Sequence, residues 1–317
     1  MRGVARAPGT CGELVQGTVN GVNFLVTCPV DLYSVVEVTL QPGRNQIKGN
    51  VANRKVEEAV ARTLAFFGAD NYAAAVRVNS SLPVGKGMAS STADITAACV
   101  ATAEALKRQI STDDIAGIAL TIEPTDGIMY PGLVLFDHVA GRMFQSLGMP
   151  PEIKILVIDP GGTVDTEQFN ARVNLPELNR QKERTVCQAL KLTEEGLASR
   201  DPGKIGRAAT MSALANQHII FKPELAEIIK IAESYRALGV NTAHSGTVIG
   251  ILYHEDATDV ESLKDILSAA NKDFQLTECT LIGGGAEIPA PESGGKAWVP
   301  YNTYMAGTSG QRRQSMG

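Results

Sequence analysis

Apolar residues recur along the chain at two different periods, which divides its first half into strands and helices. Residues 23–40 are rich in β-branched side chains between Gly and Pro and predict a strand. Residues 56–68 have apolar positions at helical spacing and end on glycine, which predicts a helix. The segment 73–83 predicts another strand, and a helix is expected from about Ser91 to Lys107. Helices and strands therefore occur in mixed order.

The second half shows the same mixture after a break at residues 148–151, Gly-Met-Pro-Pro. Residues 153–162 predict a buried strand, and the end of the structured chain, 263–285, predicts a helix followed by a strand. Further helices are predicted after a Ser111 cap and over residues 176–199, 202–216 and 223–238.

This pattern predicts an α+β fold with two domains, residues 1–150 and 151–285. Residues 286–317 are rich in Gly, Pro, Ser and other polar residues, so we expect a mostly disordered tail there.

Composition narrows the class of protein without naming it. The 317 residues are 20% charged and 44% hydrophobic with a net charge of -5, and no basic patch stands out, which argues against a nucleic-acid partner. The five cysteines are dispersed, odd in number and without metal-type spacing, which indicates reduced thiols. The sequence begins without the apolar core of a signal peptide and has no run of membrane-spanning length. We expect a cytoplasmic protein with no membrane partner.

The glycine-rich stretch at residues 83–92 suggests a phosphate-binding loop, but two familiar fingerprints fail. A Walker A loop needs Ser or Thr directly after Gly-Lys, and Gly87 follows Lys86 here. The dinucleotide fingerprint needs a third glycine where this chain has Ser90. Neither a Walker A loop nor a dinucleotide loop is predicted.

The remaining features of this stretch still favour an anion. Gly85 and Gly87 let the backbone turn with unscreened N–H groups, and Ser90, Ser91 and Thr92 begin a helix. The free N–H groups of a helix start bind anions, and hydroxyls there can contact phosphate or magnesium. The alternative is an ordinary strand-turn-helix with a serine cap and a capping box that includes Asp94.

Three motifs in order resemble the GHMP kinases, named after galactokinase, homoserine kinase, mevalonate kinase and phosphomevalonate kinase. Residues 83–93 resemble the central motif, 7–14 the N-terminal substrate motif, and 241–250 the C-terminal glycine-rich motif. Met88-Ala89 replaces the usual Leu-Gly, and a longer glycine run is missing at residues 244–246. These departures, together with residues 212–217, are similar to one branch, the bacterial L-threonine kinases of cobalamin biosynthesis.

The resemblance spans roughly residues 4–285 and implies a two-domain fold, with a ribosomal S5 domain 2-like N-terminal domain and a ferredoxin-like C-terminal domain. It implies ATP and Mg²⁺ as cofactors. The loop lysine, Lys86, adds charge at the phosphates or is simply solvated. The residues implied to hold ATP are Pro83, Val84, Gly85, Lys86, Gly87, Met88, Ala89, Ser90, Ser91, Thr92, Ser245 and Gly246.

Phosphoryl transfer also needs removal of the acceptor proton and neutralisation of charge. By match to the family, Asp126 is the candidate base, and Ser91 and Glu123 are the candidate magnesium ligands. Glu123 lies closer to Asp126 in sequence than its counterpart does in mevalonate kinase. The alternatives for Asp126 are an Asp-Gly turn or a role in orienting the hydroxyl.

On the acceptor side, Gly12, Glu13 and Asp31 are the candidate substrate residues, with Glu13 preferred over Asp31 for an ammonium group. For a carboxylate the candidates are backbone N–H groups, Arg6 and Lys86. In the C-terminal motif, His244 is a candidate phosphate contact.

The resemblance therefore predicts ATP-dependent phosphorylation of the L-threonine hydroxyl to O-phospho-L-threonine, for the nucleotide-loop linker of adenosylcobalamin. Homoserine or another small alcohol is the alternative acceptor, and a non-catalytic nucleotide-binding regulator on the same fold is the alternative class. The expected partners are ATP and a small molecule, and a homodimer is compatible with the sequence.

Overall fold

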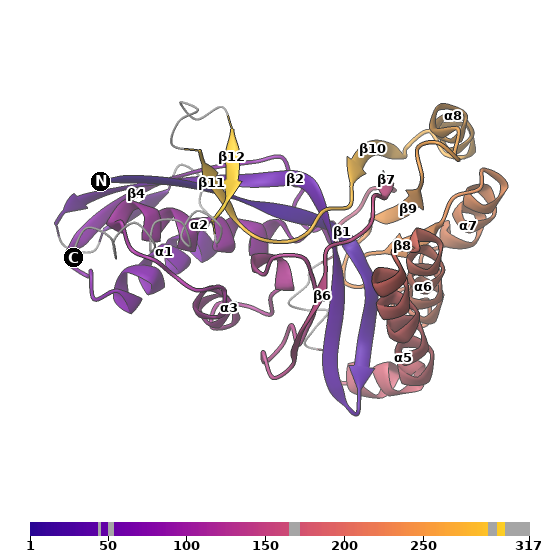
Figure 1. Cartoon of the computed structure of the whole chain (residues 1–317), viewed down its shortest axis with the longest axis horizontal. Coiled ribbons are helices and arrows are strands. Elements are labelled where there is room, and N and C mark those ends of the chain that lie inside the picture. Colours follow the sequence, from indigo (N-terminus) through magenta and orange to yellow (C-terminus); the bar gives the residue numbers. More distant parts are fainter. Residues whose placement is uncertain (44–45, 50–53, 165–171, 291–296, 302–317) are drawn as a thin grey trace.

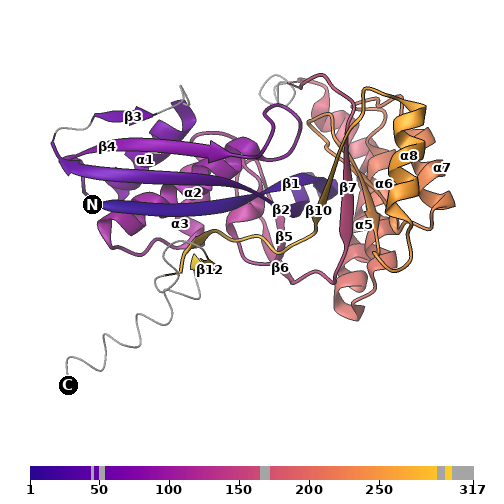
Figure 2. The ribbon, with the colours of Figure 1, turned by 90° about the horizontal axis from the view of Figure 1, so that it is seen from above.

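The computed structural model describes residues 1–43, 46–49, 54–164, 172–290 and 297–301. Over these residues, twelve strands pair into one connected sheet, and helices pack against it in two lobes (Figure 1). Seen from above, the lobes are joined by a long antiparallel ribbon of β1 (Arg2–Val19) and β2 (Val22–Pro42) (Figure 2). The first forty residues therefore contribute to both lobes.

The first lobe places three helices along one side of its strands (Figure 1). Its central helix is the alanine-rich one, because small side chains let it approach the sheet closely: a Cβ on Gly3 of β1 would lie 2.1 Å from the Ala101 carbonyl oxygen. The elements are β3 (Ile47–Gly49), α1 (Arg54–Phe66), β4 (Tyr72–Ser80), α2 (Ser90–Leu106), α3 (Thr112–Leu120), the 3-10 helix η1 (Gly127–Met129), β5 (Leu133–Phe136) and β6 (Phe144–Gly148).

The second lobe has antiparallel strands in the order β10-β7-β9-β8, covered by four helices. With α5 to α7 between the first two strands and α8 between the last two, this is the βαββαβ arrangement, so the ferredoxin-like prediction is confirmed. The elements are β7 (Lys154–Asp159), α5 (Leu175–Ser199), α6 (Pro202–Ala215), α7 (Leu225–Ser234), β8 (Gly239–Thr242), β9 (Ile249–Tyr253), α8 (Val260–Ala270) and β10 (Gln275–Thr280).

The lobes are linked where β1 pairs with β8, with Glu13 opposite Thr242. The register of the β1–β2 ribbon shifts on both sides of this point, between Pro8 and Gly9 and around Glu13. At Gly12 the backbone has a φ of +56°, and a Cβ would lie 2.5 Å from the Ala243 nitrogen. Glycine therefore allows the N-terminal motif and the C-terminal glycine motif to touch.

Most helices lie close to their predicted bounds, although α7 ends earlier, at Ser234 rather than near residue 238. Ser111 caps α3 in a capping box with Asp114, as expected from its sequence position. The division at residue 150 stays a prediction, since the ribbon before it also packs in the second lobe.

The predicted disordered tail does not hold for residues 286–290 and 297–301. The strand β11 (Glu287–Pro289) pairs with β1 at Arg6 and with β12 (Trp298–Pro300). Tyr301 is buried, and its hydroxyl accepts a hydrogen bond from the Ile110 N–H at 3.1 Å. This segment covers an edge of the first lobe, which local composition cannot reveal. The rest of the predicted tail, 291–296 and 302–317, lies outside the described residues.

The cysteines and helices agree with the compositional expectations that they test. All five cysteines are free. No helix in the described segments combines the length and the apolar character needed to cross a membrane.

Candidate active site

The loop between β4 and α2 is fixed by hydrogen bonds to its carbonyl groups from three separate segments. The Gly87 and Met88 carbonyls accept from the N–H groups of Gly12 and Thr10, at 3.1 and 3.0 Å. The Lys86 carbonyl accepts from Thr247 and Val248, at 2.9 and 3.1 Å, and the Gly85 carbonyl accepts from Val164 at 2.9 Å. With its carbonyls bound on the outside, the loop is held in one shape without using its own N–H groups in these bonds.

Glycine is required where the central and C-terminal motifs meet. Gly87 has a φ of +82°, and a Cβ on it would lie 2.3 Å from the Ala243 Cβ. A Cβ on Gly246 would lie 2.4 Å from both the Cα and the nitrogen of Gly87. These contacts explain why the two motifs carry glycine and bring them to one place.

The start of α2 has the features of an anion site rather than of a capped helix. Its N-cap residue is Ala89, in the left-handed region with a φ of 52° and with no side-chain cap. Asp94, the partner in the alternative capping box, instead accepts a hydrogen bond from the Ser34 hydroxyl at 2.5 Å. The serine-capped alternative is therefore wrong, and the first N–H groups of α2 remain for a ligand.

Beside this helix start lies a group of hydroxyls and carboxylates. The Ser91 hydroxyl donates to Glu123, which also forms an ion pair with Lys55 at 2.5 Å. The Thr92 hydroxyl lies 3.4 Å from an Asp126 carboxylate oxygen. The structure thus brings together Ser91, Glu123 and Asp126 as predicted, and adds Lys55, which sequence reasoning missed.

These oxygens suit magnesium. Mg²⁺ prefers hard oxygen ligands and binds through one or two carboxylates together with substrate phosphates, and a hydroxyl with a carboxylate beside a phosphate loop supplies such donors. No group of three or more His, Cys, Asp and Glu side chains suited to a metal occurs in the described part of the chain. The donor set therefore fits a magnesium ion that phosphates help to hold.

Asp126 is the N-cap of the short helix η1, within the loop that follows α3. The loop is anchored by a hydrogen bond from the Thr125 N–H to the His138 carbonyl, at 2.9 Å. Burial, together with the nearby negative charges of Glu13 and Glu123, raises the pKa of Asp126 to about 7. A carboxylate with a pKa near neutrality is suited to accept a proton at physiological pH.

Glu13 is buried and held by the C-terminal motif. Its Oε2 accepts from the His244 main-chain N–H at 2.8 Å and lies 3.1 Å from the His244 Nδ1. The other ring nitrogen of His244 lies 3.1 Å from the Ser212 hydroxyl. Burial raises the pKa of Glu13 to about 7. The His244 ring therefore packs between Glu13 and Ser212, away from the position expected of a phosphate contact.

A second buried cation supports the C-terminal motif. The Lys222 ammonium donates to the Gly246 carbonyl at 2.6 Å. Burial lowers the pKa of Lys222 to about 8, while Glu13 opposes that shift. Lys222, which the sequence analysis did not single out, thus holds the loop that touches Gly87.

Some predicted residues lie elsewhere. Asp31 is exposed and accepts from the Thr280 N–H at 2.7 Å, away from the loop. Lys86 is paired with Asp159 at 2.8 Å, and Arg6 with Glu287 at 2.6 Å. None of these three lines either of the two cavities described next.

A cavity of about 350 Å³ lies over the loop. Its walls include Lys55, Pro124 and Val164, which were not predicted. Of the predicted residues, those that line it are Val84, Gly85, Gly87, Met88, Ala89, Ser90, Ser91, Thr92, Glu123, Asp126, Glu13 and Ser245. The other predicted loop and motif residues, Pro83, Gly12 and Gly246, do not line it. We call this the phosphate cavity.

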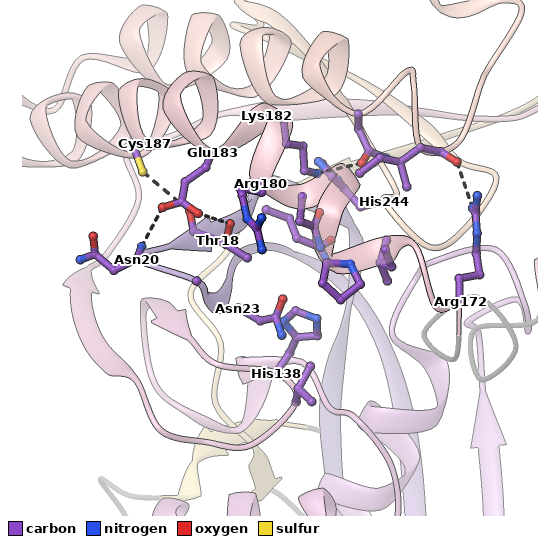
Figure 3. A pocket seen from close by; sticks show the side chains of 18 of the residues that line it. Thr18, Asn20, Asn23, His138, Arg172, Arg180, Lys182, Glu183, Cys187 and His244 are labelled. Carbon is purple, nitrogen blue, oxygen red and sulfur yellow. Dashed lines mark hydrogen bonds between the residues drawn. The ribbon is translucent and has the colours of Figure 1, made fainter.

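A larger cavity of about 950 Å³ lies beside it, between the β1–β2 turn, the loop after β5 and helix α5 (Figure 3). We call it the acceptor cavity. Pro124 lines both cavities, and His244 of the acceptor cavity contacts Glu13 of the phosphate cavity. The two cavities therefore adjoin at Pro124 and the Glu13–His244 pair.

Comparison with known proteins agrees with this geometry. Residues 53–132 match the GHMP kinases N terminal domain and residues 193–273 match the GHMP kinases C terminal domain. An L-threonine kinase of Salmonella typhimurium is 36% identical over 84% of this chain and 87% of its own length. An L-threonine kinase of Citrobacter freundii is 31% identical over 90% of this chain and 99% of its own length.

The crystal structure of a homoserine kinase from Cytophaga hutchinsonii superposes with a TM-score of 0.70 at 19% identity, over 90% of this chain and 97% of that one. The chain belongs to the GHMP kinase family. It is a phosphotransferase with an alcohol group as acceptor, and the predicted two-domain fold of that family is confirmed.

Proposed function

We propose that this enzyme transfers the γ-phosphoryl group of ATP to the side-chain hydroxyl of L-threonine. The observation that carries the proposal is the position of Asp126, which lines the phosphate cavity together with Pro124, the residue that also lines the acceptor cavity. The names of the two relatives, both L-threonine kinases, favour threonine as the acceptor.

In the proposed reaction, the first N–H groups of α2 and the loop at Gly85–Gly87 bind the phosphates. Ser91 and Glu123 would hold a magnesium ion, which neutralises charge on the phosphates. The acceptor oxygen forms a bond to the γ-phosphorus as the bond to the β,γ-bridging oxygen breaks, and ADP leaves. Asp126 accepts the proton of the hydroxyl, as its raised pKa favours.

Lys55 has a supporting part in this scheme. Its ion pair with Glu123 balances one carboxylate in a group of three that includes Asp126 and Glu13. Without it, the mutual repulsion of these acids would favour protonation of Asp126 and remove the base.

The proposed place of the product, O-phospho-L-threonine, is the nucleotide-loop linker of adenosylcobalamin. This part of the proposal rests on the sequence resemblance to one branch of the family. Location in the cytoplasm is likewise a prediction from the sequence.

A coupled ADP-release assay with L-threonine, L-serine and L-homoserine in the presence of magnesium tests the acceptor. We expect the largest kcat/KM with L-threonine and little turnover when magnesium is chelated. A larger kcat/KM with L-homoserine would replace threonine by homoserine as the acceptor. No turnover with any of the three would refute the proposed substrate class.

A further inference from the structure

The acceptor cavity contains polar atoms that are buried and have no protein partner. They are the Oε1 of Gln16, the Nδ1 of His138 and the Nδ2 of Asn216, and all three residues line this cavity. Buried polar atoms are almost always hydrogen-bonded, because each unpaired one costs about 1–3 kcal/mol. An orphaned acceptor and an orphaned amide donor in one cavity therefore indicate a polar ligand.

The cavity also contains a buried ammonium group. The side chain of Lys182 is only 4% exposed, and its Nζ donates to the Oδ1 of Asn216 at 2.8 Å. Lys182 forms no ion pair with an acid among the described residues, although Glu13 lies within electrostatic reach. Burial lowers the pKa of Lys182 to about 7. A buried cation bound to a neutral amide gains stability when an anion comes beside it.

The other basic groups of this cavity are less suited to that anion. Arg180 is paired with Glu177 at 3.1 Å and its side chain is 75% exposed. Arg172 donates to the Ile219 carbonyl at 3.1 Å. Figure 3 shows Lys182 near His244, which contacts Glu13, so the buried ammonium lies on the side of the phosphate cavity.

Two hydrogen bonds place these groups on one surface. The Gln16 main-chain N–H donates to the Ser212 hydroxyl at 3.2 Å, and Ser212 lies one helical turn before Asn216 on the same face of α6. Gln16, Asn216 and Lys182 therefore surround one end of the acceptor cavity, with two kinds of donor and one acceptor. A zwitterionic amino acid needs these groups, because its carboxylate accepts and its ammonium donates.

We propose that Lys182 and the Asn216 amide bind the α-carboxylate of the acceptor, while the Gln16 side-chain carbonyl accepts from its α-ammonium. The proposal rests on the proposed function in that the ligand is an amino acid phosphorylated at this site. It makes the enzyme specific for free amino acids over the amino alcohols that lack the carboxylate, whichever hydroxy amino acid is preferred. The carboxylate candidates from the sequence, Arg6 and Lys86, are replaced, since both are paired with acids elsewhere.

The test compares each amino acid with its decarboxylated analogue: L-threonine with 1-aminopropan-2-ol, and L-homoserine with 3-aminopropan-1-ol. We expect the wild-type enzyme to prefer the carboxylate-bearing member of each pair by about 10- to 100-fold in kcat/KM, the value of one or two charge-assisted hydrogen bonds. Equal kcat/KM values within the pairs would overturn the proposal while leaving the kinase activity intact. A preference for L-homoserine over 3-aminopropan-1-ol would support it even if threonine is not the natural acceptor.

Variants assign the effect to the named residues. We expect Lys182→Met to raise the KM for the amino acid by about 10- to 100-fold and to leave the KM for ATP unchanged. Lys182→Arg should restore part of the loss. The matched control is Lys191→Met, which removes an exposed lysine of the same helix and should match the wild type.

The residual activity of Lys182→Met with 1-aminopropan-2-ol separates recognition from damage to the fold. It should equal that of the wild-type enzyme, because the lost contact is to a carboxylate that this substrate lacks. A parallel loss with both substrates, or a raised KM for ATP, would contradict a role in carboxylate recognition.

Discussion

The phosphate cavity and the acceptor cavity adjoin, but they are built in different ways. The phosphate cavity is made largely of backbone: a loop from Val84 to Ala89 is fixed through its carbonyls, and glycines allow the close approach of neighbouring segments. The acceptor cavity is made of side chains from the β1–β2 ribbon, the loop after β5 and helices α5 and α6. The first can bind any nucleoside triphosphate phosphate, whereas the second can select an acceptor by its polar groups.

The charges of the two cavities differ as well. Three carboxylates, Glu13, Glu123 and Asp126, line the phosphate cavity, and the buried ammonium of Lys182 lines the acceptor cavity. Carboxylates near phosphates are useful only with magnesium or a proton to balance them, and the raised pKa of Asp126 reflects their repulsion. This difference assigns the chemical step to one cavity and recognition to the other.

The largest expected effect is on the chemical step. Asp126→Asn should lower kcat by about 10²- to 10⁴-fold, because the amide cannot accept the proton, and should leave the KM for ATP close to that of the wild type. Steady-state kinetics with both substrates varied measure this. Asp70→Asn, at an exposed position of the same lobe, is the control and should behave as the wild type. Near-normal kcat in Asp126→Asn would remove its role as the base.

The next effect concerns the backbone of the phosphate cavity. Gly246→Ala places a Cβ 2.4 Å from the Gly87 backbone, so the loop must shift. A shift of this kind can lower kcat/KM for ATP by about 10²-fold. The control is Gly117→Ala, where a Cβ meets nothing within 4 Å, and full activity is expected there. An unaltered kcat/KM in Gly246→Ala would show that the contact between the two motifs does not set the loop.

A smaller effect is expected at Lys222, which holds the same loop from behind. Lys222→Met leaves the Gly246 carbonyl without its 2.6 Å partner, and should lower the free energy of unfolding by about 1–3 kcal/mol while raising the KM for ATP. Urea unfolding and ATP kinetics measure the two quantities. A raised KM for the amino acid alone would instead place Lys222 in the acceptor cavity.

Lys182 makes the stability depend on pH. Its pKa is about 7 in the folded chain, below the ordinary value of 10.5, so between these values the unfolded chain binds a proton that the folded chain does not. The free energy of unfolding therefore rises with pH over this window through Lys182, and the contribution is lost as the pH falls through 7. Lys182→Met should lack this rise, which amounts to a few kcal/mol at most.

Urea unfolding of the wild type and of Lys182→Met at several pH values from 6 to 9 gives the difference directly. Lys191→Met, which alters an exposed residue of the same helix, should follow the wild type. Parallel curves for the wild type and Lys182→Met would mean that Lys182 keeps an ordinary pKa.

The two cavities also differ in how far the sequence predicts them. The phosphate loop lies in one contiguous stretch, so Gly85, Gly87 and Ser91 could be found from spacing and from the family resemblance. Lys55 had no such signal, because it stands in sequence outside every motif and reaches Glu123 only through the packing of α1.

The acceptor cavity shows the limit more clearly. Gln16, Lys182 and Asn216 come together through the bend of the β1–β2 ribbon and the packing of α5 on α6, and neither has a local sequence pattern. Asn216 lies in a segment that supported the resemblance to the threonine kinases, yet no role followed from its position. The ordered strands after residue 286 were missed for the same reason, since their partners are hundreds of residues away.

The central claim is that the two cavities act as one active site, with L-threonine as the acceptor. A ³¹P NMR time course of the enzyme with ATP, magnesium and L-threonine tests it most directly. One phosphomonoester of threonine should appear for each ADP formed, and neither should accumulate with Asp126→Asn. Formation of ADP without the phosphomonoester, or no reaction at all, would contradict the account.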